Sequence, residues 1–419
     1  MTRQGGRAAV VGAGIVGLSV AWFLQERGFE VTVLDSRGVA GGASAGNAGW
    51  VTPGMVSPLP EPGVLGYALR SLARRDSPLR VAPTALPGIA RFLATFALNC
   101  TQAKWQRGVA SLAGTAALAM DSYDLLKRGG VAAGLRPAAV VMAFRDTAEA
   151  RPVEHELRAT GAAGKGYRVS ELSQRELREE RSVLSARARY GLRLTGQGYL
   201  DPLAYTQSLA ESFRSRGGQI RSGVRIDAVR PAIGPRLTVT GTAAEADAVE
   251  ADFDVVVLAA GAWLSRLAEP VGVRLPLAAG RGYSFTVKTA TPLAGPLYLP
   301  SLRIACTPVA AGMRLAGTME FRSPDAPLDR RRIDAIIRSA QDYLEGADWG
   351  SISEVWVGPR PVTADGLPLI GATSLPGVYA AGGHGMWGMT LGPVTGRLLA
   401  EYIATGDRPA ELRDFDPCR

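Results

Sequence analysis

Three glycines near the start of the chain have the spacing of a dinucleotide-binding motif. Gly12, Gly14 and Gly17 follow a short apolar run and open a helical pattern. The first permits a tight turn, the second lets the backbone approach a pyrophosphate, and the third lets helix pack on strand. A second apolar run, 30–34, ends on Asp35, which we expect to accept hydrogen bonds from a ribose. The phosphates are expected at the positive end of the helix.

A second glycine-rich turn lies near the other end of the chain. Segment 382–392 holds five glycines and precedes an expected helix over 391–404, with Thr390 as its cap. Such a turn lets the backbone approach a flat ligand, and the helix then points its positive end at negative charge. A reduced flavin carries such charge, whereas a nicotinamide enzyme does not need this second turn. The alternative is an ordinary turn before a terminal helix.

The composition is that of a globular enzyme with two or three domains, because 47% of the residues are hydrophobic and 20% are charged. The net charge is +9, but the basic residues are scattered, which favours a solvated surface over a nucleic-acid site. Two histidines and three widely spaced cysteines argue against a metal site or a disulfide framework. The early first strand leaves no room for a cleavable leader, and no long apolar run marks a membrane span, so we expect a cytoplasmic protein.

Four apolar runs, near residues 10, 31, 255 and 379, read as buried strands of one parallel sheet, although they are far apart in the sequence. The pattern also predicts a strand over 131–144, helices over 147–160 and 170–185, and a helix that starts at Asp201-Pro202. The fold class is therefore α/β. One Rossmann-like domain is assembled from several segments, and an α+β substrate domain with an antiparallel sheet is inserted between them. The nucleotide domain is assigned to 1–60, 199–270 and 351–419, and the substrate domain to 61–198 and 271–350.

Taken together, the motifs resemble the FAD-dependent D-amino acid oxidase superfamily, and within it the small subunit of bacterial D-amino acid dehydrogenase. The segments that carry this resemblance run in the family's order: the Gly12-Gly14-Gly17 motif with Asp35, 44–49 followed by Pro53-Gly54, 282–284, 358–366 and 383–385.

The resemblance implies FAD. It places Asn47 and Ala48 nearest the flavin ring and a backbone contact to adenine at Val224, whereas packing is the alternative role for Trp263. The cofactor is expected to bind non-covalently, because Cys306 lies earlier in its hairpin than the flavin-linking cysteine of some relatives. The implied cofactor-binding residues are Gly12, Gly14, Ile15, Val16, Gly17, Asp35, Ser36, Ser44, Asn47, Ala48, Gly49, Val224, Ala260, Gly261, Trp263, Gly383, His384, Gly385, Gly388, Met389 and Thr390.

Arg360 is the leading candidate to bind a substrate carboxylate. A guanidinium is planar, permanently charged and able to bind a carboxylate through two parallel hydrogen bonds. Arg360 also occupies an Arg-Pro position that resembles the one used by related glycine- and D-amino-acid-oxidising enzymes. The alternative is a structural ion pair with Asp365. Arg281 and Arg303 are weaker candidates.

Two further residues are candidates for the catalytic site. Tyr283, in an expected strand of the second domain, either lines the substrate pocket or packs in the core. His384 is a possible base, although its glycine neighbours favour a role for the loop backbone. No tyrosine stands directly before the hairpin at 304–308, where glycine oxidases have one, which argues against glycine oxidase proper.

The resemblance implies oxidation of a D-amino acid, or a cyclic relative such as D-proline or a hydroxyproline, by hydride transfer from Cα to flavin N5. A quinone or another carrier is the expected electron acceptor. An oxygen-using oxidase, a flavin-dependent tRNA-modifying enzyme and a non-catalytic FAD-binding subunit are the alternatives. Segment 56–96 is apolar and proline-rich, so it either touches a membrane surface or packs within the second domain.

Overall fold

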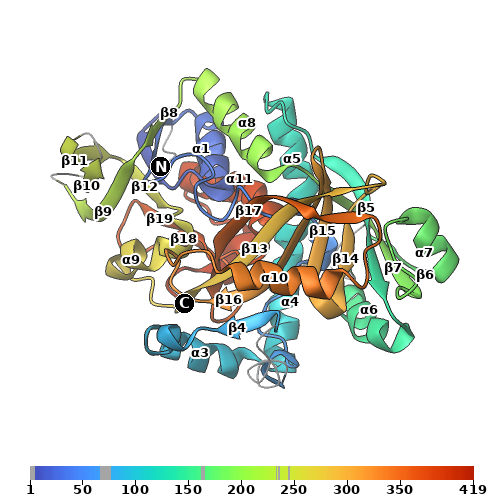
Figure 1. Ribbon diagram of the computed structural model, residues 1–419. Helices are drawn as coiled ribbons and strands as arrows, with labels where there is room; N and C mark the ends of the chain where they lie inside the picture. The colour runs from blue at the N-terminus through green and yellow to red at the C-terminus, as the bar shows by residue number, and fades with distance from the viewer. Residues whose placement is uncertain (1–4, 67–76, 162–165, 233, 235, 244–245) are drawn as a thin grey trace.

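A six-stranded sheet forms the nucleotide-binding half of the molecule (Figure 1). The computed structural model describes the chain except residues 1–4, 67–76, 162–165, 233, 235 and 244–245. The strand order is β18-β19-β12-β1-β2-β8, and only the pair β18–β19 is antiparallel. The bounds are β1 Arg7–Val11, β2 Glu30–Asp35, β8 Gln219–Ser222, β12 Val255–Leu258, β18 Leu369–Ala372 and β19 Val378–Gly382.

Both faces of this sheet are covered. One face packs against α1 (Ile15–Glu26), α5 (Ala119–Arg128), α8 (Pro202–Ser215) and α11 (Gly388–Thr405). The other face packs against α9 (Leu264–Ala268) and an antiparallel sheet of β9 (Val224–Pro231), β10 (Leu237–Ala243) and β11 (Ala246–Phe253), which projects at the left of Figure 1. Because both faces are buried, β12 is apolar at every position, as its sequence predicted.

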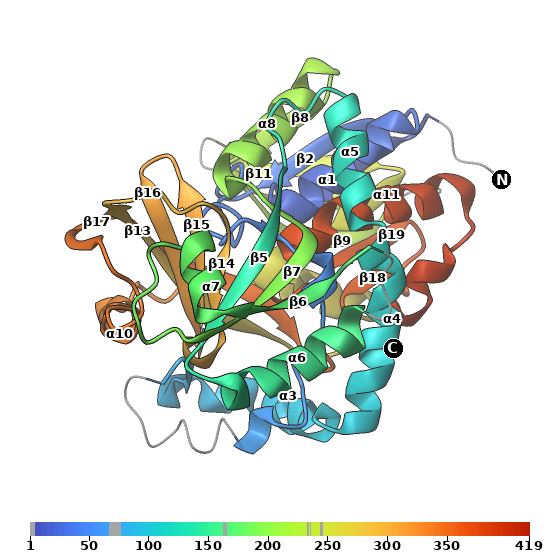
Figure 2. The ribbon, with the colours of Figure 1, turned by 90° about the vertical axis from the view of Figure 1, so that its right-hand side faces the viewer.

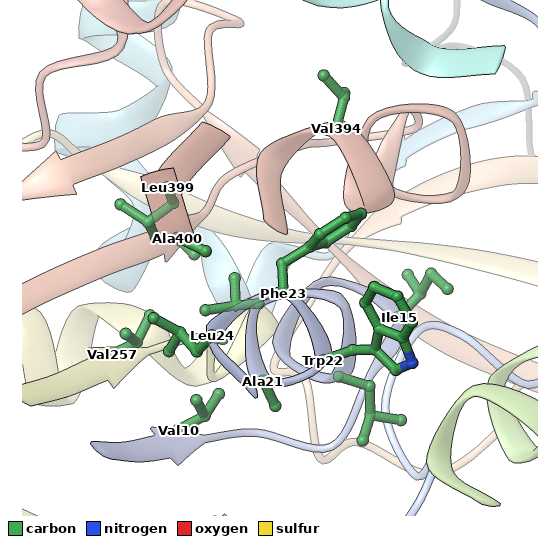
Figure 3. Close-up of a cluster of buried hydrophobic side chains, with 14 of the residues drawn as sticks. Val10, Ile15, Ala21, Trp22, Phe23, Leu24, Val257, Val394, Leu399 and Ala400 are labelled. Atoms are coloured by element: carbon green, nitrogen blue, oxygen red, sulfur yellow. The ribbon is translucent and has the colours of Figure 1, made fainter. Parts of the chain in front are cut away.

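Helices α1 and α11 join the two ends of the chain in one core. Trp22 and Phe23 of α1 share one buried hydrophobic cluster with Val394 and Leu399 of α11 (Figure 3). A Cβ added to Gly396 of α11 would lie 2.5 Å from the Ser19 carbonyl carbon of α1, so the helices touch backbone to backbone. This contact places the glycine-rich turn before α11 close to the glycine motif before α1.

A ten-stranded sheet forms the second half, beside the first in Figure 2. Its main order is β17-β13-β16-β15-β14-β5-β7-β3, with β4 added on β16 and β6 added on β7. The bounds are β3 Trp50–Val51, β4 Leu79–Val81, β5 Arg136–Phe144, β6 Val169–Ser173, β7 Tyr190–Tyr199, β13 Leu277–Thr289, β14 Leu297–Leu299, β15 Ile304–Val309, β16 Gly312–Phe321 and β17 Ala347–Thr363.

The sheets follow the predicted segments with two differences. All six strands of the parallel-type sheet lie within 1–60, 199–270 and 351–419. However, β3 pairs with β7 of the other sheet, and β17 crosses the predicted boundary at residue 350 because it pairs with β13 along its length. The domain division itself stays a prediction.

The remaining α-helices of the part of the chain that the structure describes are α3 (Leu86–Asn99), α4 (Gln102–Ala117), α6 (Thr147–Gly161), α7 (Gln174–Glu180) and α10 (Arg330–Ala340). The expected helices starting near residues 147 and 202 are confirmed, and Asp201 caps the second by accepting from the backbone N–H of Ala204 at 3.0 Å. The helix expected over 170–185 is wrong: β6 occupies its start by pairing with β7, and α7 then runs only to Glu180. The strand expected over 131–144 begins at Arg136.

The apolar stretch 56–96 contributes to the second domain. Phe92 and Phe96 of α3 are buried against Phe321 of β16, with the Phe92 and Phe321 ring centroids 5.4 Å apart. Residues 67–76 of this stretch lie outside the described residues. Among the helices that the structure describes, none is long and apolar enough to cross a membrane.

Candidate active site

A cavity of about 360 Å³ opens where the parallel strands β1 and β2 end. Its walls include three distant parts of the chain: the turn that starts α1, the segment after β12, and the turn that starts α11. The crevice at the carboxyl ends of parallel strands is where open α/β sheets bind nucleotides. The lining therefore agrees with the position that the glycine motifs predicted.

The glycines around this cavity divide into two groups by what a side chain would meet. A Cβ on Gly17 would lie 1.9 Å from the Gly12 carbonyl oxygen, so this glycine is needed for packing of helix on strand. Gly261 and Gly385, both at φ +54°, have no atom within 4 Å of an added Cβ, and Gly14 has only the Ser44 hydroxyl. These three positions leave bare backbone facing the cavity, as a bound flat cofactor requires.

Asp35 ends β2 and lines the first cavity. One carboxylate oxygen accepts from Ala13 N at 2.7 Å, and the other accepts from Arg37 N and Gly38 N at 2.7 and 2.8 Å. A carboxylate offers about four acceptor sites, so one remains for a ribose hydroxyl. The side chain therefore orders the turn and can still bind a nucleoside.

The loop 44–49 is held from both sides. Ser44 Oγ accepts from the backbone N–H of Ile15 at 3.1 Å, at the start of α1. On the other side, the hydroxyls of Ser284 and Thr307 donate to the carbonyls of Gly46 and Ala48 at 2.8 and 2.7 Å. The second sheet thus fixes a loop that lines the first cavity.

The structure places the predicted cofactor residues as follows. Those that line the cofactor cavity are Gly12, Gly14, Ile15, Val16, Gly17, Asp35, Ser36, Ser44, Asn47, Val224, Ala260, Gly261, Trp263, His384, Gly385, Gly388 and Met389. Four others do not line it: Ala48, Gly49, Gly383 and Thr390.

Packing explains the positions of these four. Ala48 lines the neighbouring cavity, whereas Gly49 lies against the Leu200 carbonyl, 2.1 Å from an added Cβ. Gly383 similarly lies against the Thr363 methyl group. The expectation that Thr390 caps the last helix is wrong, because α11 already begins at Gly388 and the Thr390 hydroxyl instead accepts from Thr52 N at 3.1 Å.

A cluster that the sequence did not reveal closes the rim of the cofactor cavity. The Arg37 guanidinium lies 4.3 Å from the centre of the Trp263 ring and forms an ion pair with Asp325. The Trp263 indole N–H also donates to Asp325, at 3.1 Å to Oδ2. The three residues come from three separate segments, and nothing in their local sequence indicated that they meet.

A second cavity of about 380 Å³ adjoins the first, since Ala43, Asn47 and Arg360 line both. Its walls are mostly apolar and aromatic. The apolar side chains include Trp50, Leu59, Val64, Leu79, Phe92, Phe96, Met319, Phe321, Trp356 and Trp387. Two cavities that meet at a cation suit a cofactor in one and an anionic substrate in the other.

Arg360 lies at this junction, on β17. Its Nη1 donates to the Thr318 carbonyl at 2.9 Å, and Gly282 of β13 leaves the space that the guanidinium fills. The alternative partner, Asp365, instead pairs with Arg419 at 2.7 Å, and no carboxylate of the described residues forms an ion pair with Arg360. Burial lowers the pKa of Arg360 to about 10, so the side chain remains a cation at neutral pH.

The other candidate side chains already have partners. Tyr283 is buried at the edge of the second cavity and donates to Glu320 at 2.7 Å, and burial raises its pKa to about 12. Arg281 is buried beside the same Glu320, with Nη1 3.8 Å from Oε2, and lines neither cavity. Arg303 does line the second cavity, but its guanidinium pairs with Glu61 at 3.3 Å.

His384 lines the cofactor cavity from the turn before α11. Its Nε2 bonds the Thr395 hydroxyl at 2.9 Å, and its Nδ1 is buried with no hydrogen-bond partner among the described residues. Burial lowers the pKa of this histidine to about 4, so the ring is neutral at physiological pH. The structure thus leaves one buried ring nitrogen of a cavity-lining residue without a hydrogen-bond partner among the described residues.

One tyrosine of the second cavity was missed. The chain has no tyrosine directly before the hairpin at 304–308, as the sequence indicated, but Tyr298 of β14 reaches the cavity from the paired strand. Its ring stands edge-on to Trp50, with centroids 5.9 Å apart, and burial raises its pKa. The pairing of β14 with β15, rather than proximity in sequence, puts it there.

Comparisons with known proteins agree with this geometry. The model of the FAD dependent oxidoreductase family, DAO, matches residues 7–402. The chain belongs to this family. Its cofactor is FAD, and the predicted family membership and cofactor are confirmed.

Relatives and solved structures extend over nearly the whole of this FAD-dependent oxidoreductase. A D-amino acid dehydrogenase of Xanthobacter autotrophicus is 31% identical over 417 residues, covering 98% of this chain and 97% of that protein. One of a Methylobacterium species is 32% identical, covering 96% of each chain.

Two solved structures show the same fold. Glycine oxidase from Geobacillus kaustophilus has a TM-score of 0.73 at 21% identity and covers 100% of this chain and 99% of its own. L-alpha-glycerophosphate oxidase from Mycoplasma pneumoniae with FAD bound has a TM-score of 0.73 at 15% identity, covering 96% and 95%. The predicted fold class, a parallel cofactor sheet with an inserted antiparallel domain, is confirmed.

Proposed function

We propose that this flavoprotein is an amino acid dehydrogenase that oxidises D-amino acids. The observation that carries the proposal is Arg360, a partly buried cation at the junction of the two cavities with no carboxylate partner among the described side chains. Burying a lone cation is costly, and an anionic substrate would compensate its charge. The similarity to proteins named D-amino acid dehydrogenase over almost their full length supports an amino acid as that anion.

The protein's part in the reaction is to bind and orient. Arg360 holds the carboxylate by a fork of hydrogen bonds, which turns Cα toward the cofactor cavity. Bound FAD would take the hydride from Cα at its N5 atom. The aromatic walls of the second cavity exclude water from the reacting centre.

No described side chain at the junction is poised as a base. His384 is neutral but fully buried with its Nε2 bonded to Thr395, and the Tyr283 hydroxyl is engaged by Glu320. The substrate amine therefore binds in its neutral form and needs no base at the moment of transfer. The imino product is released, and water hydrolyses an acyclic imine to a 2-oxo acid and ammonia.

The second cavity favours an apolar side chain. Its volume of about 380 Å³ is far more than glycine needs, and Phe92, Phe96 and Phe321 form one wall. The charged pair Arg303–Glu61 on another wall is already neutralised within itself. A charged substrate side chain would lose its hydration there without gaining an unpaired partner.

FAD is proposed to bind non-covalently. Cys306 is fully buried in the core of the second sheet, and burial raises its pKa to about 12, so it is not a reactive thiolate. No cysteine of the described residues lines either cavity. Release of yellow FAD on acid or heat denaturation would support this, whereas colour retained on the denatured protein would contradict it.

Anaerobic flavin reduction tests the proposed function. Holoenzyme is mixed without oxygen with D- and L-amino acids, prolines and N-methyl amino acids. The visible absorbance of the oxidised flavin is then followed, because it is lost when the flavin is reduced. We expect bleaching by D-amino acids with apolar side chains. If no amino acid bleaches the flavin, the proposal is wrong. Reoxidation by a soluble quinone but slowly by air would support the dehydrogenase over an oxygen-using oxidase.

A further inference from the structure

Strand β16 departs from regular pairing directly beside Arg360. Opposite the single residue Gly282 of β13, β16 carries two residues, Thr318 and Met319, which makes a β-bulge. Bulges occur next to active sites because the extra residue re-aims neighbouring groups. Met319 pairs outward with β4, and its N–H donates to the Pro78 carbonyl at 2.6 Å. Both residues line the second cavity, and the Thr318 carbonyl accepts from Arg360 at the junction of the two cavities.

The backbone of Thr318 is in the left-handed region, at φ +59°. This conformation is an outlier for a β-branched residue, whose branched Cβ collides with the backbone there. Asparagine or glycine would adopt it at lower cost. A strained threonine that the surrounding sheet holds in place is a reason to look for a function of its side chain.

Both polar groups of Thr318 bear on the Arg360 site. Its carbonyl accepts from Arg360 Nη1 at 2.9 Å, which fixes one edge of the guanidinium. Thr318 is one of the residues that line the second cavity and is only 8% exposed, and its hydroxyl is buried with no hydrogen-bond partner among the described residues. A buried hydroxyl without a partner is unfavourable unless a ligand supplies one.

We propose that the Thr318 hydroxyl is the second arm of the carboxylate anchor and donates a hydrogen bond to the substrate carboxylate that Arg360 holds. This inference rests on the proposed function, in which the substrate is an amino acid. An anion seated on the guanidinium lies beside Thr318, because the Thr318 carbonyl touches that guanidinium. The guanidinium charge attracts the carboxylate to this place, so the hydroxyl bonds the carboxylate.

The test uses a ligand that has a carboxylate and no amine. Benzoate is titrated into oxidised holoenzyme, and its Kd is read from the change in the flavin absorbance. In Thr318→Val, which keeps the branched shape and removes the hydroxyl, we expect the benzoate Kd to rise roughly 10- to 100-fold, as for a lost hydrogen bond to a charged group. Thr318→Ser, which keeps the hydroxyl, should stay within a few-fold of the wild type.

A matched control and a second ligand separate the possible outcomes. Thr238→Val, on β10 and remote from both cavities, should leave the Kd unchanged. The KM for the best D-amino acid should rise in Thr318→Val with kcat changing less. FAD content and melting temperature show whether the variant is folded, and Thr318→Ala gives a second removal of the hydroxyl if valine does not fit.

Two results would overturn the inference. Either wild-type holoenzyme fails to bind benzoate, or Thr318→Val binds it as tightly as the wild type. If Thr318→Val raises the KM for the amino acid but not the Kd for benzoate, the Thr318 hydroxyl bonds the substrate amine rather than its carboxylate, and the inference is wrong. If benzoate binding weakens in Thr318→Val but no amino acid reduces the wild-type flavin, the anchor stands and the proposed function falls.

Discussion

Substituting Gly282 by alanine should disable the carboxylate anchor while leaving the cofactor bound. A Cβ at this position would lie 2.2 Å from Arg360 Nη2, 2.3 Å from Cζ and 2.6 Å from Nη1. Gly282 lines the substrate cavity and not the cofactor cavity. The added methyl group therefore acts on Arg360 and hardly at all on FAD.

The size of the effect follows from these distances. Non-bonded heavy atoms settle at about 3.5–4.0 Å, so the guanidinium must move by more than about 1 Å. The guanidinium is the far end of a flexible side chain, so it can move without unfolding the sheet. A misplacement of about 1 Å in a group that orients the substrate costs roughly 100-fold in rate. We expect kcat/KM of Gly282→Ala to fall by about this factor, roughly 2.7 kcal/mol at 1.36 kcal/mol per tenfold.

Stopped-flow reduction of the flavin without oxygen measures both parts of the effect. The dependence of rate on substrate concentration yields the substrate Kd and the limiting rate, and the flavin spectrum reports FAD content. Gly134→Ala is the control, because a Cβ there meets no atom within 4 Å. Wild-type Kd and limiting rate in a folded, FAD-loaded Gly282→Ala would refute the role given to Arg360, since its guanidinium cannot stay where it is.

Three further predictions concern the cofactor rim, the buried histidine and the cavity wall. Asp325→Ala removes the hydrogen-bond acceptor shared by Arg37 and Trp263, so FAD should dissociate faster. The fluorescence of released FAD measures this rate. An unchanged dissociation rate would show that the cluster does not help to retain FAD. Burial lowers the pKa of His384 from 6.5 to about 4, so between these pH values the unfolded state binds a proton that the folded state does not. The free energy of unfolding should therefore fall as the pH drops from 6.5 to about 4, by up to about 3 kcal/mol. His384→Gln should show a flatter pH profile in denaturant unfolding, and an identical slope would argue against a buried neutral ring. Phe92→Ala opens the apolar wall of the second cavity and should shift the kcat/KM preference toward substrates with bulkier side chains. It should also lower the free energy of unfolding by about 3–5 kcal/mol, the cost of such a core truncation. An unchanged substrate preference would show that this wall does not contact the substrate.

The parts of the site that the sequence predicted are local. Gly17 must be glycine because a Cβ there would lie 1.9 Å from the Gly12 carbonyl oxygen, and this requirement is visible within five residues of sequence. The same holds for the Asp201 cap, and for β12, whose apolar run reports burial on both faces. Such features depend on the backbone next to them, so their residues carry the information.

The parts that were missed depend on pairing between distant segments. The helix expected over 170–185 was wrong because β7 recruits its first residues as β6, which overrides their helical pattern. Tyr298 reaches the substrate cavity through a strand pair, and Asp325 meets Trp263 across 62 residues of sequence. No local pattern marks residues of this kind.

The chain's sequence by itself predicted that FAD is bound by glycine turns near both ends of the chain, and that Arg360 was the residue to test. It could not tell whether Arg360 is free to bind a substrate. The tertiary structure decided this, because Asp365 turns to Arg419 and the bulge at Thr318 lies against the guanidinium. The charge of a side chain is a property of the sequence, but the partners that compensate it, and hence what it can bind, are set by which strands pair.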